Sequence, residues 1–132
     1  MSEENVEKAE GFLRAYNRRD FDEAMQHFDP QIEWVLPEMM GFDSCVGCDQ
    51  VMRFFQGLDE SWDELRLDAL ESVDAGDRVA TRLYYHGRGK RSGAEIDTEL
   101  YHQVAFFREG RIVRMEYVES WPAALELAGV ES

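Results

Sequence analysis

The second half of the chain consists of long strand-like runs joined by short turns, and this pattern limits the chain to few folds. The runs predicted as strands are Leu65 to Asp74, Val79 to Arg88, Glu95 to Phe107 and Ile112 to Glu119. Their connections are short and contain glycine, which suits hairpins. Sequential strands joined by hairpins pair in opposite directions, so the sequence predicts an antiparallel meander.

Apolar residues recur at helical spacing in the first half. Val6, Ala9, Leu13 and Tyr16 follow one another at three- and four-residue intervals and predict an amphipathic helix. The elements predicted outside the meander are a helix over residues 4–17, a helix from Asp20 to about His27, a strand over Gln31–Leu36, a helix beginning at Asp49 and a terminal helix over Ala123–Ala128 with Gly129 as its C-cap. Helices followed by antiparallel strands indicate an α+β fold in which the helices cover one face of a curved sheet.

Length and charge exclude several classes of function. The 132 residues fit one hydrophobic core, so we expect a single domain over residues 1–132. The 28 acidic residues outnumber the 14 Lys and Arg residues and give a net charge of -14, which disfavours nucleic acids and anionic membranes as partners. No apolar run approaches the roughly 20 residues that cross a bilayer, and the first residues lack the features of a secretion signal. We therefore expect a cytoplasmic protein.

Cys45 and Cys48 form a C-x-x-C motif, a spacing found in zinc and redox sites. A structural zinc needs four ligands, and neither a second such motif nor a pair of suitably spaced histidines completes the set. The motif also follows a glycine-rich connection rather than a strand, although a helix is predicted to begin close by. We predict two reduced thiols, no metal site and no cofactor.

Segments from nearly the whole chain combine into one family pattern. They are Phe12–Ala24, Pro30–Trp34, Gly47–Phe55, Asp74–Val79, Phe107–Ile112 and Ala123–Gly129. With the order helix, helix, tryptophan-bearing strand, helix and four-strand meander, they resemble the SnoaL-like branch of the nuclear transport factor 2-like superfamily. The resemblance implies a cystatin-like α+β fold in which a curved antiparallel sheet wraps as a cone around N-terminal helices. It implies no single activity, because the superfamily includes isomerases, polyketide cyclases and members without known chemistry.

An apolar cavity between the helices and the concave face of the sheet is also implied by the resemblance, and it is the default ligand site. Strand alternation predicts the residues of that face to be Ile32, Trp34, Leu36, Val79, Thr81, Leu83, Tyr85, Tyr101, Gln103, Ala105, Phe107, Val113, Met115, Tyr117 and Glu119. The residues expected to contact a ligand are Phe12, Trp34, Met39, Phe54, Phe55, Tyr85, Tyr101, Met115 and Tyr117. Such a lining suits a flat apolar molecule; ordinary core packing is the alternative for the same residues.

Catalysis of the ketosteroid isomerase type does not fit this sequence. Isomerases of this fold use an Asp base on the first strand, with a Tyr and a protonated Asp as donors to the oxyanion. The corresponding positions carry Trp34, Phe12 and Gln103. Since tryptophan cannot take a proton from carbon, we do not expect that mechanism.

The candidate catalytic residues are Glu119, Gln103 and Tyr16. We expect Glu119 at the mouth of the cavity, where apolar surroundings would favour its protonated form and suit it to acid-base chemistry. Gln103 and Tyr16 would donate hydrogen bonds to a developing oxyanion. The alternative for Glu119 is an ordinary solvent-exposed carboxylate. His102 alternates with Gln103 and should face away from the cavity.

Two classes of function remain open at this point. The first is a cofactor-free isomerase or cyclase that acts on an apolar cyclic or polyketide-like molecule. The second is a binding or interaction module of the same fold without catalysis. The residues expected on the outer face of the sheet are Tyr84, His86, Leu100, His102, Val104, Phe106, Ile112 and Val118. Because this face is more apolar than a solvated sheet face, we expect a homodimer to form through it.

Overall fold

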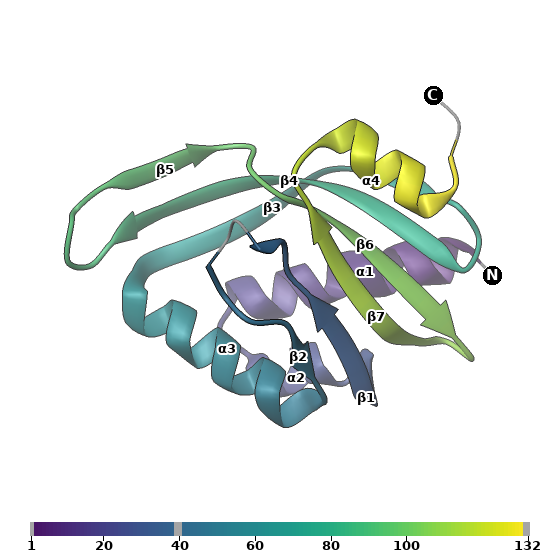
Figure 1. Cartoon of the computed structure of the whole chain (residues 1–132). Coiled ribbons are helices and arrows are strands. Elements are labelled where there is room, and N and C mark those ends of the chain that lie inside the picture. Colours follow the sequence, from purple (N-terminus) through teal and green to yellow (C-terminus); the bar gives the residue numbers. More distant parts are fainter. Residues whose placement is uncertain (1, 39–40, 131–132) are drawn as a thin grey trace.

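Helices and strands are segregated along the chain, as the α+β prediction requires. The structure is a computed structural model that describes residues 2–38 and 41–130 (Figure 1). Its elements are α1 (Ser2–Asn17), α2 (Phe21–Met25), β1 (Phe28–Val35), β2 (Cys45–Val46), α3 (Cys48–Ser61), β3 (Trp62–Asp74), β4 (Arg78–Gly89), β5 (Glu95–Thr98), β6 (His102–Arg108), β7 (Arg111–Val118) and α4 (Trp121–Ala128). None of the described helices is long and apolar enough to cross a membrane.

The strands form one curved, open sheet in the order β2-β1-β7-β6-β4-β3, with β5 paired to β4 (Figure 1). Neighbouring strands are antiparallel except β1 and β7, which run parallel. This pairing sets Trp34 opposite Met115, so the first strand lies directly beside the last. The concave wall is therefore assembled from both ends of the chain.

Local capping explains where the helices begin and end. The Asp20 side chain accepts a hydrogen bond from the Glu23 backbone nitrogen at 3.1 Å, as the sequence predicts. Ser120 caps α4 in the same way through the Ala123 nitrogen, and Gly129 ends that helix with a φ of 82°. Because proline is tolerated in the first helical turn, α4 begins at Trp121, earlier than predicted.

The predicted strand from Glu95 to Phe107 is wrong, because the structure divides it into β5 and β6. Both segments pair with β4, and Thr98 lies opposite Tyr85 while Gln103 lies opposite Thr81. Along β4 these two pairs are four residues apart, whereas along the chain from β5 to β6 they are five residues apart. One extra residue interrupts the ladder there, and alternation alone could not locate it.

A second irregularity reverses two predictions on β7. Phe106 lies opposite Arg114 and Phe107 opposite Ile112, so Val113 has no direct partner across the strands. At this bulge the alternation shifts by one residue. Ile112, predicted to face outward, is fully buried in the main core, and Val113, predicted to face inward, is half-buried outside it.

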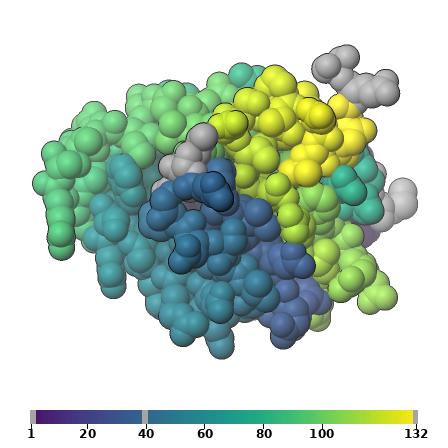
Figure 2. Space-filling model, in the orientation of Figure 1, coloured from purple at the N-terminus to yellow at the C-terminus, as the bar shows by residue number. Residues whose placement is uncertain are grey.

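Both faces of the sheet are covered. The concave face packs on α1 and α3, and the main core lies between them. The convex face carries a smaller cluster in which Ala80 and Val104 pack against Ala124 and Ala128 of α4. Figure 2 shows α4, in yellow, resting on the green strands beside it. This arrangement leaves the concave face as the wall that lines the internal pocket.

Candidate functional site

An aromatic pocket of about 240 Å³ lies between α1, α3 and the concave face of the sheet. All of its lining residues are aromatic or aliphatic. They are Phe12, Leu13, Tyr16, Trp34, Leu36, Phe42, Phe54, Phe55, Leu58, Trp62, Leu65, Leu67, Tyr85, Ile96, Leu100, Tyr101 and Tyr117. Among the residues described, none that lines this pocket is acidic, basic, a histidine or a cysteine.

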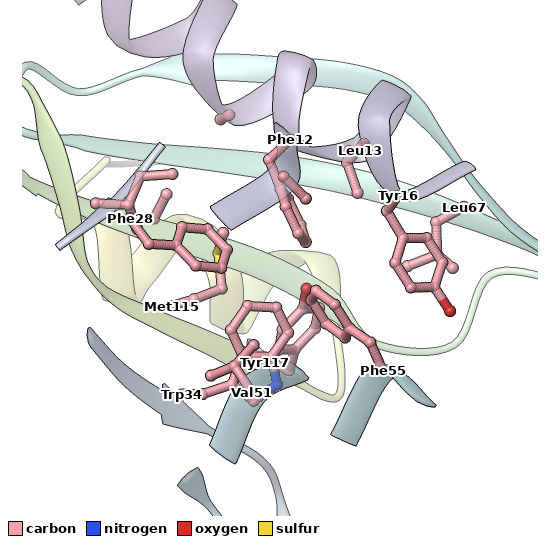
Figure 3. Packing of buried hydrophobic residues seen from close by; sticks show 14 of the residues in the cluster. Phe12, Leu13, Tyr16, Phe28, Trp34, Val51, Phe55, Leu67, Met115 and Tyr117 are labelled. Carbon is pink, nitrogen blue, oxygen red and sulfur yellow. The ribbon is translucent and has the colours of Figure 1, made fainter. Parts of the chain in front are cut away.

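Trp34 is the centre of the ring packing behind this lining. Its ring centroid lies 5.3 Å from Phe55, 5.3 Å from Tyr117 and 5.8 Å from Phe12. The Phe12 and Phe55 contacts are edge-to-face, a geometry that aromatic quadrupoles favour. Figure 3 shows these rings gathered between α1 and the strands. The deep wall is thus shaped by fixed, interlocking rings.

Three tyrosine hydroxyls in the wall, those of Tyr16, Tyr85 and Tyr117, stay protonated at neutral pH. Burial raises the pKa of Tyr16 to about 12, and it raises the pKa of Tyr85 and of Tyr117 further. The Tyr85 hydroxyl donates to the backbone oxygen of Tyr101 at 2.8 Å, and the Tyr117 hydroxyl donates to Gln103 Oε1 at 3.1 Å. Tyr16 Oη makes no hydrogen bond within the described part of the chain. These groups can donate hydrogen bonds, but none of them is a base near pH 7.

Two buried donors on the concave face have no hydrogen-bond partner among the described residues. They are Trp34 Nε1 and Gln103 Nε2, and their side chains are 2% and 0% exposed. An unpartnered buried donor costs about 1–3 kcal/mol, which makes such groups rare in stable cores. Trp34 and Gln103 flank β7 from β1 and β6, so both lie next to the strand that carries Tyr117.

Most residues predicted to contact a ligand are brought together by the structure. Phe12, Trp34, Phe54, Phe55, Tyr85, Tyr101 and Tyr117 all line the pocket. Met115 is fully buried but lies outside the lining, and Met39 lies outside the described residues. Sequence reasoning missed Trp62, because the third strand was predicted to begin only at Leu65. It also missed Phe42, which comes from a loop. Leu100 was predicted on the outer face but lines the pocket, as does Ile96, because both precede the extra residue that interrupts the alternation between β5 and β6.

The three candidate catalytic residues are separated. Tyr16 lines the pocket, and Gln103 is buried behind Tyr117 on the predicted face. Glu119 differs from the prediction: it is exposed in the bend between β7 and α4 and does not line the pocket. The alternation that placed it inward stops at Val118, where β7 ends and the chain turns toward the convex side.

His102 faces away from the pocket, as predicted, but it is not on a free surface. The imidazole is 4% exposed, packs edge-on against Trp121 of α4 and accepts a hydrogen bond from the Leu83 nitrogen through Nδ1 at 3.0 Å. Val104 is buried under the same helix, and Phe106 and Val118 pack against it. Much of the apolar outer face that predicted a dimer is therefore covered within the chain itself.

Of the C-x-x-C cysteines, Cys45 lies in β2 and Cys48 is the first residue of α3, and both are free thiols. Burial, with Asp43 beside Cys45 and Asp49 beside Cys48, raises the pKa of each thiol. This setting is the reverse of that of a reactive cysteine, which needs a lowered pKa. Over residues 2–38 and 41–130, no group of three or more His, Cys, Asp or Glu side chains could hold a metal ion.

Solved structures with this architecture cover almost all of the chain. An NTF2-like protein of unknown function from Burkholderia pseudomallei K96243 is 21% identical, with a TM-score of 0.81 over 95% of this chain and 97% of that one. TerC, co-crystallised with polyporic acid, is 23% identical, with a TM-score of 0.79 over 96% of this chain and 98% of TerC. A protein from Xanthomonas campestris proposed to be a polyketide cyclase is 17% identical, with a TM-score of 0.74 over 96% and 98%. At these identities the likeness shows the fold alone.

Sequence comparison places the chain more narrowly than the fold does. No curated protein matches it. The family model for the SnoaL-like domain, however, matches residues 9–115, a span that runs from the middle of α1 through β6 and into β7 as far as Met115. The chain therefore belongs to the SnoaL-like domain family.

Proposed function

We propose that this chain is a small-molecule-binding domain whose pocket holds a flat, uncharged aromatic molecule. The observation that carries the proposal is the composition of the lining, which is entirely aromatic or aliphatic among the described residues. A charged ligand would lose its hydration there without gaining a counter-charge. A flat aromatic ligand would instead stack on the rings of the wall.

The pocket volume sets the size of the ligand. Its volume is about 240 Å³. A dry apolar cavity of roughly 150 Å³ accommodates benzene. We therefore expect a ligand with two or three fused rings, of which any further part extends through the mouth beside Phe42 and Leu100. The likeness to TerC supports the proposal, since that protein of the same fold was crystallised with polyporic acid.

Tryptophan fluorescence tests binding directly. Trp34 and Trp62 line the pocket, whereas Trp121 lies on the other side of the sheet. In a chain carrying Trp62→Phe and Trp121→Phe, titration with 2-ethylnaphthalene should change Trp34 emission saturably. A change that rises linearly without saturation would contradict a defined site.

A matched pair of substitutions on β3 controls this experiment. Leu67 lines the pocket, and Leu70, three residues along, is 51% exposed. Leu67→Phe should fill part of the pocket and weaken 2-ethylnaphthalene binding, whereas Leu70→Phe should leave it unchanged. Equal effects of the two substitutions would show that the hydrocarbon binds elsewhere.

A cofactor-free isomerase or cyclase is the second candidate. It is favoured by the Tyr16 hydroxyl, which lines the pocket without a hydrogen-bond partner in the described chain and could donate to a developing oxyanion. Because the described lining lacks a carboxylate or imidazole, the proton acceptor would be water or the substrate itself. Turnover of a polyketide-like ketone that falls at least about tenfold in Tyr16→Phe would support this function, and unchanged turnover would contradict it.

We also propose that the chain forms a homodimer through the part of the outer sheet face that α4 leaves uncovered. Tyr84 and His86 remain partly accessible there with their rings 4.9 Å apart, whereas Leu100, which was also expected on this face, lines the pocket. Aromatic residues such as Tyr are enriched at protein–protein interfaces. Sedimentation equilibrium at micromolar concentration should give twice the mass of one chain, and Tyr84→Glu should reduce it to that of one. A single-chain mass for the unmodified protein would contradict the dimer.

A further inference from the structure

The hydrogen bond between Gln103 and Tyr117 joins the pocket wall to a fully buried amide. Tyr117 lines the pocket, and its hydroxyl donates to Gln103 Oε1 at 3.1 Å. Gln103 is 0% exposed, and its Nε2 has no partner among the described residues. One end of this amide is therefore bonded, and the other end is left with two unused N–H groups.

Rotating the amide by half a turn reverses the direction of this hydrogen bond. Gln103 Nε2 then donates to Tyr117 Oη, and the O–H bond of Tyr117 is free to point toward another acceptor. Oε1 becomes the unpartnered atom, and unpaired carbonyl oxygens are tolerated somewhat better than unpaired N–H groups. Neither orientation satisfies every polar atom of the Gln103–Tyr117 pair. A ligand that bonds to Tyr117 can therefore select one orientation over the other.

Tyr85 offers a contrast in the same wall. Its hydroxyl donates to the backbone oxygen of Tyr101 at 2.8 Å. A backbone carbonyl can only accept, so this bond cannot be reversed. Of these two bonded tyrosines, Tyr117 alone has a partner that can exchange donor and acceptor roles.

We propose that Gln103 is a specificity-determining residue that lets Tyr117 bind a ligand oxygen in either role. With the amide as in the structure, Tyr117 Oη accepts from a ligand hydroxyl. With the amide rotated, Tyr117 donates to a ligand carbonyl. The pocket then receives a ketone and the corresponding alcohol or enol with similar affinity. This inference rests on the proposed binding function, because it requires that the pocket holds an aromatic ligand.

Three probes with one ring system test the inference by isothermal titration calorimetry. They are 2-ethylnaphthalene, 2-acetylnaphthalene and 1-(2-naphthyl)ethanol, which carry a hydrocarbon chain, a ketone and an alcohol. In the unmodified chain, the ketone and the alcohol should each bind about two- to tenfold more tightly than the hydrocarbon, as expected for one hydrogen bond. The ratio of their affinities should stay constant between pH 5 and pH 9, because neither probe titrates there.

Gln103→Glu should make this ratio depend on pH. Burial raises the pKa of a carboxyl group, so the new side chain should be protonated at pH 5 and ionised at high pH. The protonated form can donate to Tyr117 and preserve ketone binding. The ionised form only accepts, so it holds the Tyr117 proton and should reduce ketone affinity about three- to tenfold relative to the alcohol. Gln31→Glu, the same change at an exposed position on β1, should leave the ratio constant.

The outcomes separate this inference from the function on which it rests. If 2-ethylnaphthalene does not bind the unmodified chain, the binding function fails and the inference fails with it. If all three probes bind but the ratio stays constant in Gln103→Glu, the inference alone is overturned. A ratio that changes in Gln103→Glu and becomes constant again when Tyr117→Phe is added supports the pair.

An infrared measurement serves if Gln103→Glu does not fold. A hydrogen bond lowers the stretching frequency of a carbonyl, so 2-acetylnaphthalene bound to the unmodified chain should absorb at lower frequency than in hexane. Tyr117→Phe should return the band to its position in hexane. A band already at that position in the unmodified chain would overturn the proposal.

Discussion

The two faces of the sheet differ in how their buried polar side chains are hydrogen-bonded. His102 and Gln103 are adjacent on β6, and alternation sends one to each face. On the convex face the imidazole accepts from the Leu83 nitrogen through Nδ1, packs on Trp121 and places Nε2 3.8 Å from Glu99 Oε1. On the concave face the Gln103 amide keeps an unpartnered Nε2 among the described residues. The side closed by the chain's own helix is satisfied, and the side that encloses a pocket is left incomplete.

Charge follows the same division. Ion pairs cross the convex strands where α4 does not cover them, as between Arg82 and Glu99 and between Arg114 and Glu33. The described lining of the pocket has no charged group. The contrast teaches that unsatisfied hydrogen bonding, rather than charge, distinguishes the side of the sheet that encloses the pocket.

The largest effect should come from removing a ring of the concave wall. Phe12 is 2% exposed and contacts Phe28, Trp34 and Phe55. Phe12→Ala should lower the free energy of unfolding by about 3–5 kcal/mol, measured by urea denaturation. Phe42→Ala provides the control, because Phe42 lines the same pocket at its mouth and is 47% exposed. A similar loss in both variants would mean that the deep wall is not a packed core.

A smaller loss is expected on the convex face. His102→Leu leaves the Leu83 nitrogen without its acceptor inside a buried strand pair, which should cost about 1–3 kcal/mol. His86 on β4 is more exposed; it forms surface ion pairs with Asp68 and Asp97 and contacts the ring of Tyr84. His86→Leu should therefore change stability by less than about 1 kcal/mol. If His86→Leu were the more destabilising change, the role assigned to the α4 contact would be wrong.

The stability of the fold should also depend on pH through His102, with a smaller effect than that of the substitution. Burial lowers the pKa of His102, so the folded state disfavours protonation relative to the unfolded chain. Its contribution to stability is complete above the unfolded pKa of about 6.5 and declines as the pH falls below that value. Melting temperatures between pH 8 and pH 5 should decrease toward acid, and less steeply in His102→Asn. His27, whose pKa is also lowered by burial, supplies part of the remaining slope.

The smallest effect is expected at the C-x-x-C motif, which lies outside the contrast between the two faces. Both thiols are only partly buried and free. Replacing Cys45 and Cys48 together by Ser should change the melting temperature by no more than about a few degrees. Zinc bound in proportion to the protein, measured by elemental analysis, would refute the assignment of incidental thiols.

Alternation predicted the concave wall wherever a strand is regular. Trp34, Tyr85 and Tyr117 lie where a two-residue period places them, because successive side chains of a strand point to opposite faces. The prediction failed at Val113 and Glu119, where a bulge and a strand end interrupt the period. Bulges depend on how neighbouring strands fit together, which one strand's sequence does not record.

The convex face shows a different limit of sequence reasoning. His102 and Val104 were assigned correctly to the outer face. That face was expected to be accessible to solvent or to a partner, whereas both residues are buried. The covering helix is short, and its small residues Ala124 and Ala128 allow close approach to the strands. The apolar side of that terminal helix, matched to the apolar outer face, was the signal available in the sequence.

The parallel pairing of β1 with β7 has a consequence for how the chain folds. Strand β1, from Phe28 to Val35, pairs with residues 112–116 of β7, which come about 80 residues later in the sequence. Contacts between distant parts of a chain form late, because closing the intervening loop loses entropy before any contact compensates for it. During synthesis, the helices and the outer hairpins can form while Trp34 still lacks its neighbour. The aromatic wall would then be completed only after Tyr117 has left the ribosome, so we expect the pocket to form later than the helices and the outer hairpins.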